Sequence, residues 1–146
     1  MKNQSEADHR QQKQAAVEQY RGEGREFLAQ NAKKEGVVVL PSGLQYRVIT
    51  EGTGKTPAAN DTVTVHYRGT LINGQEFYNS RRGKETPESF HVGAVVKGMS
   101  EALQLMKVGA KWQIFVPADL AYGERGPVGE RVVIFDLELI SIKPSE

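Results

Sequence analysis

The chain passes from strand to loop within Lys111–Gly123, which reads Lys-Trp-Gln-Ile-Phe-Val-Pro-Ala-Asp-Leu-Ala-Tyr-Gly. Trp112, Ile114 and Val116 recur at every second position, which is typical of a strand with one buried face. Pro117 has no backbone N–H to donate to a sheet, so the strand is predicted to end before it. The apolar residues that follow predict one of two arrangements. They form either a turn packed into the core or the wall of a shallow apolar site that offers the hydroxyl of Tyr122.

The composition limits the classes of function. The chain has 146 residues, 38% of them hydrophobic and 25% charged, which suits one globular domain with an appendage. Its net charge of +1 gives no global field that would attract nucleic acid or an anionic membrane. Because cysteine is absent, disulfides, thiolate metal ligands and cysteine nucleophiles are excluded. We expect no membrane span and no signal peptide, since no apolar run is long enough and Met1–Glu6 is polar.

Helix-forming residues dominate from about Ser5 to Lys34, so one or two helices are predicted there. Gly22 and Gly24 each cost roughly 1 kcal/mol relative to alanine in a helix interior. A break or bend near Arg21–Arg25 is therefore expected. The apolar residues of this region are sparse, which leaves two interpretations: a solvated or partly packed helix, or the end of a longer helix that pairs with another subunit.

A change in sequence character near residue 36 predicts a domain boundary. Helix formers give way to Val37-Val38-Val39, which is followed by Pro41 and Gly43. We therefore expect a helical arm at residues 1–35 and a β-rich domain at residues 36–146. Its first strand is predicted from Leu44 to Thr50, with alternate side chains on one face.

The clearest strand pattern lies at Asp61–Leu71. Alternation places Tyr67 on its buried face and His66 on its exposed face. Asn73-Gly74 follows directly, and this pair is a strong signal for a β-hairpin because both residues tolerate a positive φ. The second strand of the hairpin contains Phe77, which is therefore expected close to Tyr67.

A short amphipathic helix is predicted after a solvated, basic loop at Ser80–Glu88 and a short extended piece that includes Phe90. Apolar residues recur at three- and four-residue spacing over residues 99–106, and Ser100 or Gly98 is the expected cap. This helix can cover only one face of the sheet. It is therefore expected to form one wall of any cavity on that side.

Few side chains are spaced for covalent or metal chemistry. The last predicted strand, Arg131–Lys143, carries Asp136 and Glu138 on one face, where neighbouring Lys and Arg residues favour a solvated, salt-bridged surface over acid–base catalysis. The three histidines are far apart in the sequence, so no metal or cofactor is expected. The remaining candidates are aromatic and aliphatic side chains from several predicted elements: Tyr67, Phe77, Phe90, Val95, Val96, Met99, Tyr122 and Phe135.

Five segments carry a family resemblance: Val65-His66-Tyr67-Arg68-Gly69-Thr70-Leu71, Asn73-Gly74-Gln75-Glu76-Phe77, Val95-Val96-Lys97-Gly98, Ala121-Tyr122-Gly123 and Phe135-Asp136-Leu137-Glu138-Leu139. In this order they resemble the FK506-binding-protein (FKBP) type of peptidyl-prolyl cis-trans isomerase. Leu40–Tyr46 and Glu101–Val108 are similar to its bacterial macrophage-infectivity-potentiator (Mip) branch. The resemblance covers about residues 25–143. It implies an α+β fold in which a bent antiparallel sheet wraps around one short α-helix, preceded by an N-terminal helix.

The resemblance also implies an enzyme of protein folding that accelerates rotation about X–Pro bonds. This rotation crosses a barrier of about 18–20 kcal/mol because the twisted amide loses its resonance. An apolar site favours the less polar twisted amide, and the Tyr122 hydroxyl can hold the substrate carbonyl. By resemblance, the catalytic residues are Tyr122, Phe77 and Phe135. The substrate contacts implied in the same way are Tyr67, Phe77, Tyr78, Phe90, Val95, Val96, Met99, Tyr122 and Phe135.

Three departures from the family pattern fall at this site. Tyr78 stands where the family has aspartate, Met99 stands where it has tryptophan, and the Glu124–Arg131 loop is shorter and lacks Ile-Pro-Pro. We therefore expect weakened isomerase activity and lowered affinity for macrolides such as FK506 or rapamycin. The alternative is an FKBP-fold peptide-binding or chaperone module that has lost most of its catalysis.

The Mip-like branch also implies partners and a location. The expected partners are proline-containing peptides or unfolded proteins, and a homodimer through the N-terminal helix is a further possibility. No nucleic-acid partner is expected. The implied location is the periplasm or the outer membrane of a Gram-negative bacterium, and the alternative is the cytoplasm.

Overall fold

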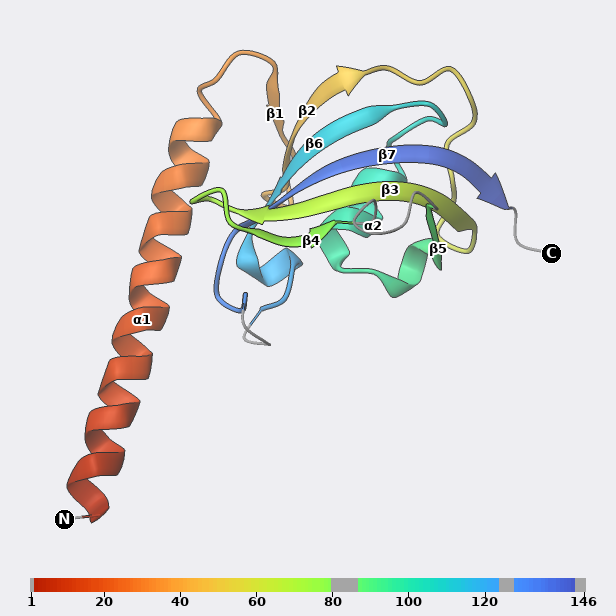
Figure 1. Cartoon of the computed structure of the whole chain (residues 1–146). Helices are drawn as coiled ribbons and strands as arrows, with labels where there is room; N and C mark the ends of the chain where they lie inside the picture. The colour runs from red at the N-terminus through yellow and green to blue at the C-terminus, as the bar shows by residue number, and fades with distance from the viewer. Residues whose placement is uncertain (1, 80–86, 124–127, 144–146) are drawn as a thin grey trace.

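One long helix lies beside the end of a curved sheet, and a short helix lies under the concave side of that sheet (Figure 1). The structure, a computed structural model, describes residues 2–79, 87–123 and 128–143, with side chains from residue 14 onward. The elements in chain order are α1 (Lys2–Asn31), β1 (Val37–Val39), β2 (Gln45–Thr50), β3 (Thr62–Leu71), β4 (Glu76–Asn79), β5 (Glu88–His91), the 3₁₀ turn η1 (Val92–Ala94), α2 (Lys97–Leu103), β6 (Lys111–Val116), the 3₁₀ turn η2 (Ala118–Leu120) and β7 (Val133–Lys143).

All strand pairs are antiparallel and form a 7-stranded sheet in the order β1-β2-β6-β7-β3-β4, with β5 pairing with β3. The pairing register shifts at three points, between Val48 and Thr50, between Thr64 and Val65, and between Gly69 and Thr70. Such irregularities bend strands, and the sheet accordingly curves over α2 (Figure 1). No helix in the described part of the chain is long and apolar enough to cross a membrane.

The predicted hairpin between β3 and β4 is confirmed, and its turn uses only one positive φ. The carbonyl of Leu71 accepts a hydrogen bond from the N–H of Gly74 at 2.9 Å, and the N–H of Leu71 donates to the carbonyl of Gln75 at 2.9 Å. Gly74 has a φ of 90°, whereas the side chain of Asn73 accepts a hydrogen bond from the N–H of Gln75. The result is a three-residue loop with glycine in the left-handed position.

Helix α2 begins earlier than predicted and has a different cap. Val96 is the capping residue and makes no side-chain cap bond, so the expected caps Ser100 and Gly98 were wrong. Gly98 instead permits close packing, because a Cβ atom there would lie 2.4 Å from Cγ1 of Val116. The predicted apolar face is confirmed, since Met99 and its helical neighbours are buried together with Met106 just beyond the helix end.

The break predicted in the N-terminal helix was wrong, because α1 runs without interruption from Lys2 to Asn31. Gly24 lets the helix approach the sheet domain, since a Cβ atom there would lie 2.8 Å from Cγ2 of Val132. The ring of Phe27 packs on Phe115 with centroids 6.0 Å apart. The amide of Asn31 donates to the side chain of Gln45 at 2.8 Å. The second half of α1 is therefore packed against the sheet domain, whereas its N-terminal half extends beyond it (Figure 1).

Several strand faces differ from simple alternation because neighbouring elements cover them. Phe115 is buried on the face of β6 opposite Trp112, since Phe27 packs over it. In β2, Val48 is 38% exposed, whereas Gln45 is buried and is hydrogen-bonded to Asn31 of α1.

His66, predicted to be exposed, is only 7% exposed. It lies opposite Glu138 on β7 and lines a hollow together with the longer side chains of Arg68 and Lys111.

Two predicted loops fall partly outside the described residues. Of the predicted loop at Ser80–Glu88, residues 80–86 are not described, and Glu88 belongs to strand β5 instead. The predicted extended piece around Phe90 is confirmed as that strand. In the short loop at Glu124–Arg131, residues 124–127 are not described.

The two glycines of α1 form a matched pair for testing its packing. A Cβ atom at Gly22 would meet nothing within 4 Å. Gly22→Ala should therefore raise the free energy of unfolding by about 0.5–1 kcal/mol through helix propensity. Gly24→Ala should lower it, because the added methyl meets the stiff, buried side chain of Val132 and overpacking costs about 1–3 kcal/mol. Urea unfolding measures both changes, and equal stabilisation by the two substitutions would contradict this packing.

Candidate functional site

The predicted aromatic site residues gather around the ring of Phe135 on the buried face of the sheet. Phe135 is 0% exposed. Tyr67 meets it edge-on with centroids 5.8 Å apart, and Phe77 does so at 6.0 Å. Tyr67 and Phe77, which were expected close to each other, thus share one buried ring. We call Tyr67, Phe77, Tyr78, Phe90, Tyr122 and Phe135 the aromatic cluster.

The outer members of the aromatic cluster contact these inner rings. Tyr122 meets Phe77 nearly perpendicularly, at 6.0 Å and 87°. Phe90 meets Tyr67 at 6.1 Å and 79°, whereas Tyr78 stacks on Tyr67 at 4.5 Å and 14°. Edge-to-face and offset-stacked arrangements are the favoured geometries of aromatic pairs. The cluster is therefore well packed before any ligand binds.

A single glycine in β3 permits this arrangement. A Cβ atom at Gly69 would lie 2.6 Å from the ring of Phe77 and 3.1 Å from the ring of Phe135. Because such distances are far below van der Waals contact, any side chain at this position would push the two rings apart. Gly69 is part of a motif that the sequence analysis singled out, but its role in packing follows only from the three-dimensional structure.

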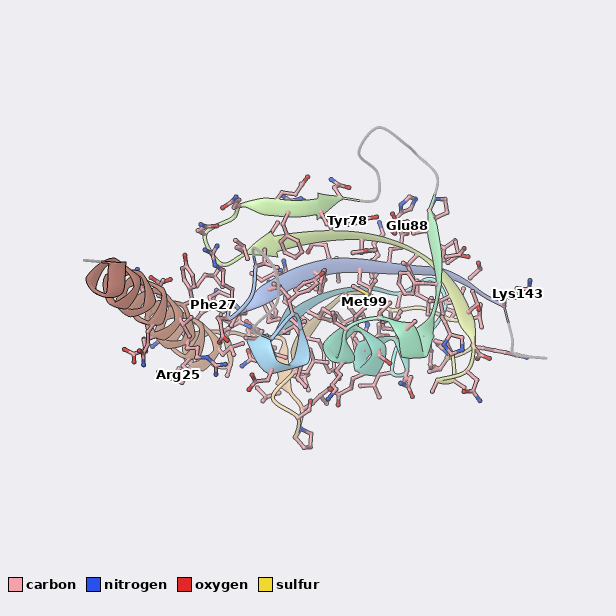
Figure 2. The ribbon with its side chains drawn as sticks, turned by 90° about the horizontal axis from the view of Figure 1, so that it is seen from below. Arg25, Phe27, Tyr78, Glu88, Met99 and Lys143 are labelled. Carbon is pink, nitrogen blue, oxygen red and sulfur yellow. The ribbon has the colours of Figure 1, made fainter. Side chains whose placement is uncertain are left out.

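The aliphatic candidates approach the cluster from the α2 side. Val95 and Val96 are partly buried just before the helix, and Met99 in its first turn is only 3% exposed. Figure 2 shows Met99 on α2 and Tyr78 on the outer strand β4. All eight sequence candidates thus lie in or against one continuous hydrophobic core.

Two phenols give the cluster its polar groups. Burial, together with the nearby charges of Glu88 and Tyr122, raises the pKa of Tyr67 to about 12. Burial also raises the pKa of Tyr122. Both hydroxyls are therefore protonated at neutral pH and can donate a hydrogen bond. An apolar ring and an adjacent carbonyl are the groups that such a site can bind.

Glu88 is the residue that sequence reasoning missed. It was assigned to a solvated loop, but it belongs to strand β5 and is partly buried, as is Phe90 two residues later. The signal available in the sequence was the two-residue spacing of Glu88 and Phe90, because alternate residues of a strand lie on the same face. The polar residues that precede Glu88 in the sequence concealed this signal.

A hollow of about 460 Å³ lies on the opposite face of the sheet. The charged side chains that line it pair with their neighbours. Lys111 lies 3.9 Å from Glu138, and Gln113 donates to Asp136 at 3.0 Å. The predicted salt-bridged face at Asp136 and Glu138 is confirmed, and these satisfied pairs offer no reactive group. Within the described residues, no three His, Asp or Glu side chains form a metal site.

Two family sequence models match the chain. The model described as FKBP-type peptidyl-prolyl cis-trans isomerase matches residues 53–140. The model described as the domain amino terminal to FKBP-type peptidyl-prolyl isomerase matches residues 1–48. Together they account for nearly the whole chain.

Curated relatives and solved structures agree with these matches. An outer membrane protein MIP from Legionella longbeachae is 50% identical over 87% of this chain and 56% of its own length. The FKBP-type 22 kDa peptidyl-prolyl cis-trans isomerase of Escherichia coli is 48% identical over 82% of this chain and 60% of its own length. The chain therefore spans little more than half of each relative. The match to the crystal structure of FkpA from Escherichia coli covers 99% of this chain and 70% of the FkpA chain. Its TM-score is 0.86 and its sequence identity is 36%. This match confirms the predicted fold.

The raised pKa of Tyr67 predicts a change of stability at alkaline pH. Between pH 10 and about 12 the folded state keeps a proton that the unfolded state loses, so the free energy of unfolding should fall as pH rises through this window. Tyr67→Phe should remove this part of the pH dependence. Urea unfolding at pH 9 and pH 11.5 measures it in both proteins, and identical pH dependence would contradict the burial of this hydroxyl.

Proposed function

Because the chain belongs to the family of FKBP-type peptidyl-prolyl cis-trans isomerases, we propose that it accelerates the rotation of X–Pro bonds in protein substrates. The observation that carries this proposal is the aromatic cluster. The ring of Phe77 contacts both the buried ring of Phe135 and the ring of Tyr122, whose hydroxyl is protonated. The proline ring would occupy the apolar part of this site. The hydroxyl would hold the carbonyl beside the rotating bond.

The proposed mechanism needs no covalent step. The planar amide loses its resonance as it twists, which is the origin of a barrier of about 18–20 kcal/mol. A water-poor site favours the less polar twisted amide over the planar one, and an oriented hydroxyl can stabilise the carbonyl in that state. We assign the catalytic roles to Tyr122, Phe77 and Phe135.

The remaining cluster members would contact the substrate. Tyr67, Tyr78 and Phe90 contribute rings from β3, β4 and β5. Val95, Val96 and Met99 contribute aliphatic side chains at the start of α2. With Phe77, Tyr122 and Phe135, these side chains would enclose a proline from the sheet side and from the helix side.

Two substitutions support the proposal that activity is weakened. Tyr78 stacks on Tyr67 and replaces a family aspartate with an uncharged ring. Met99 supplies an adaptable thioether chain in place of a rigid indole. These features equally favour the second candidate function, a peptide-binding or chaperone module with little catalysis. Lowered affinity for macrolides such as FK506 or rapamycin is part of the same proposal.

The arm at residues 1–35 and the isomerase domain at residues 36–146 are proposed as separate functional parts. The N-terminal half of α1, which extends beyond the sheet domain, would support a homodimer (Figure 1). A location in the periplasm or at the outer membrane is supported by the relative that is named an outer membrane protein. The cytoplasm is the alternative.

The isomerase proposal is tested with short proline peptides by NMR exchange. The protein should accelerate the exchange, and Tyr122→Phe should lower kcat/KM about tenfold, since a lost hydrogen bond of about 1.4 kcal/mol corresponds to that factor. Tyr46→Phe is the matched control, because its ring stacks on Trp112 outside the aromatic cluster. If the protein does not accelerate cis-trans exchange even at high concentration, the catalytic proposal is contradicted and the peptide-binding module is favoured.

The origin of weakened catalysis is tested by restoring the family residues. Tyr78→Asp and Met99→Trp, together, should raise kcat/KM because they return a carboxylate and a rigid ring to the site. Circular dichroism establishes whether the double variant keeps its fold. An unchanged rate in a folded variant would count against the roles given to positions 78 and 99.

The role of the arm is tested by two deletions. Removing residues 1–13 should leave the free energy of unfolding nearly unchanged but abolish the dimer. Removing residues 1–35 should also lower stability by about 3–5 kcal/mol, because it deletes Phe27 from its contact with Phe115. Sedimentation reports the mass and urea unfolding the stability. If the protein has the same number of subunits with and without the arm, dimerisation through α1 is ruled out.

A further inference from the structure

Glu88 brings a carboxylate to the aromatic cluster. On β5, Glu88 and Phe90 are partly buried, whereas Ser89 and His91 between and beyond them are exposed. The hydroxyl of Ser89 pairs with that of Thr64 on the outer face, at 2.9 Å. Glu88 and Phe90 therefore share the inner face of the strand, and Phe90 meets the ring of Tyr67 from that face.

The pairing register fixes how far along the sheet Glu88 lies. Glu88 is opposite Val65 on β3, and Tyr67 is two residues further along the same face. Figure 2 shows Tyr78 and Glu88 along the same side of the molecule, at the ends of β4 and β5. The carboxylate is close enough to the Tyr67 hydroxyl to contribute to the rise of its pKa.

Glu88 forms no ion pair with a lysine or arginine in the described residues 14–79, 87–123 and 128–143. A partly buried carboxylate without a partner attracts a cation, and the faces of the stacked Tyr67 and Tyr78 rings attract cations as well. Tyr78 is itself uncharged. The side of the site between β4 and β5 therefore combines a negative charge with aromatic faces.

We propose that Glu88 determines substrate specificity by favouring chains that carry Lys or Arg next to the proline. The cationic side chain would lie between the Glu88 carboxylate and the ring of Tyr78 while the proline occupies the centre of the aromatic cluster. This inference rests on the proposed isomerase function. It adds a preference for cationic segments of unfolded proteins.

The test compares three peptides that differ only in the residue before proline, which is Lys, Gln or Glu, and a second set with these residues after proline. In at least one set, the unmodified protein of residues 1–146 should have a higher kcat/KM for the Lys peptide than for the Gln peptide. Glu88→Gln should reduce this ratio about threefold to tenfold. High salt should reduce the ratio in the unmodified protein and leave it unchanged in the variant.

Two further variants make the result specific. Glu51→Gln removes the same charge from an exposed position after β2, which is separated from β3 by two strands, and it should leave the ratio unchanged. Glu88→Lys should invert the preference in favour of the Glu peptide. A Lys-to-Gln ratio that is the same in the unmodified protein and in an active Glu88→Gln variant would overturn the inference. Failure to accelerate any peptide would instead overturn the isomerase function itself.

Discussion

The packing of two aromatic rings against Phe135 is the interaction on which the candidate site depends. Phe135 belongs to the central strand β7 and to the hydrophobic core, yet it also receives the edges of Tyr67 and Phe77. Gly69 leaves the space in which these rings meet. The same contacts thus stabilise the sheet and hold the inner wall of the proposed site. A substitution that weakens the packing of the core is therefore expected to weaken the site as well.

The side chains on the two faces of the sheet differ in chemistry. The inner face is apolar, packs on α2 and ends in two protonated phenols. On the outer face, Asp136 and Glu138 pair with polar and cationic neighbours, so the hollow there contains satisfied groups. We place the proposed site on the inner face because of its apolar surroundings and its protonated phenols, and not because of the size of a cavity.

Charge at the aromatic cluster differs from the family pattern at position 78. The aspartate expected after Phe77 is replaced by Tyr78, which extends the aromatic surface by stacking on Tyr67. Glu88 places a carboxylate at the start of β5. With an uncharged ring at position 78 and a carboxylate at position 88, the proposed site could bind proline at its centre and select flanking residues by their charge.

The amino-acid sequence by itself determined the strand positions, the hairpin and the apolar face of α2, because period-two and helical spacings depend on local backbone geometry. It also placed the aromatic candidates in one family site. Only the tertiary structure decided that α1 is unbroken at Gly22 and Gly24, that Phe115 and His66 are buried, and that Glu88 lies on the same face of the sheet as Tyr67. These features depend on contacts between residues far apart in the chain, such as Gly24 with Val132. Local spacing carries no information about such contacts.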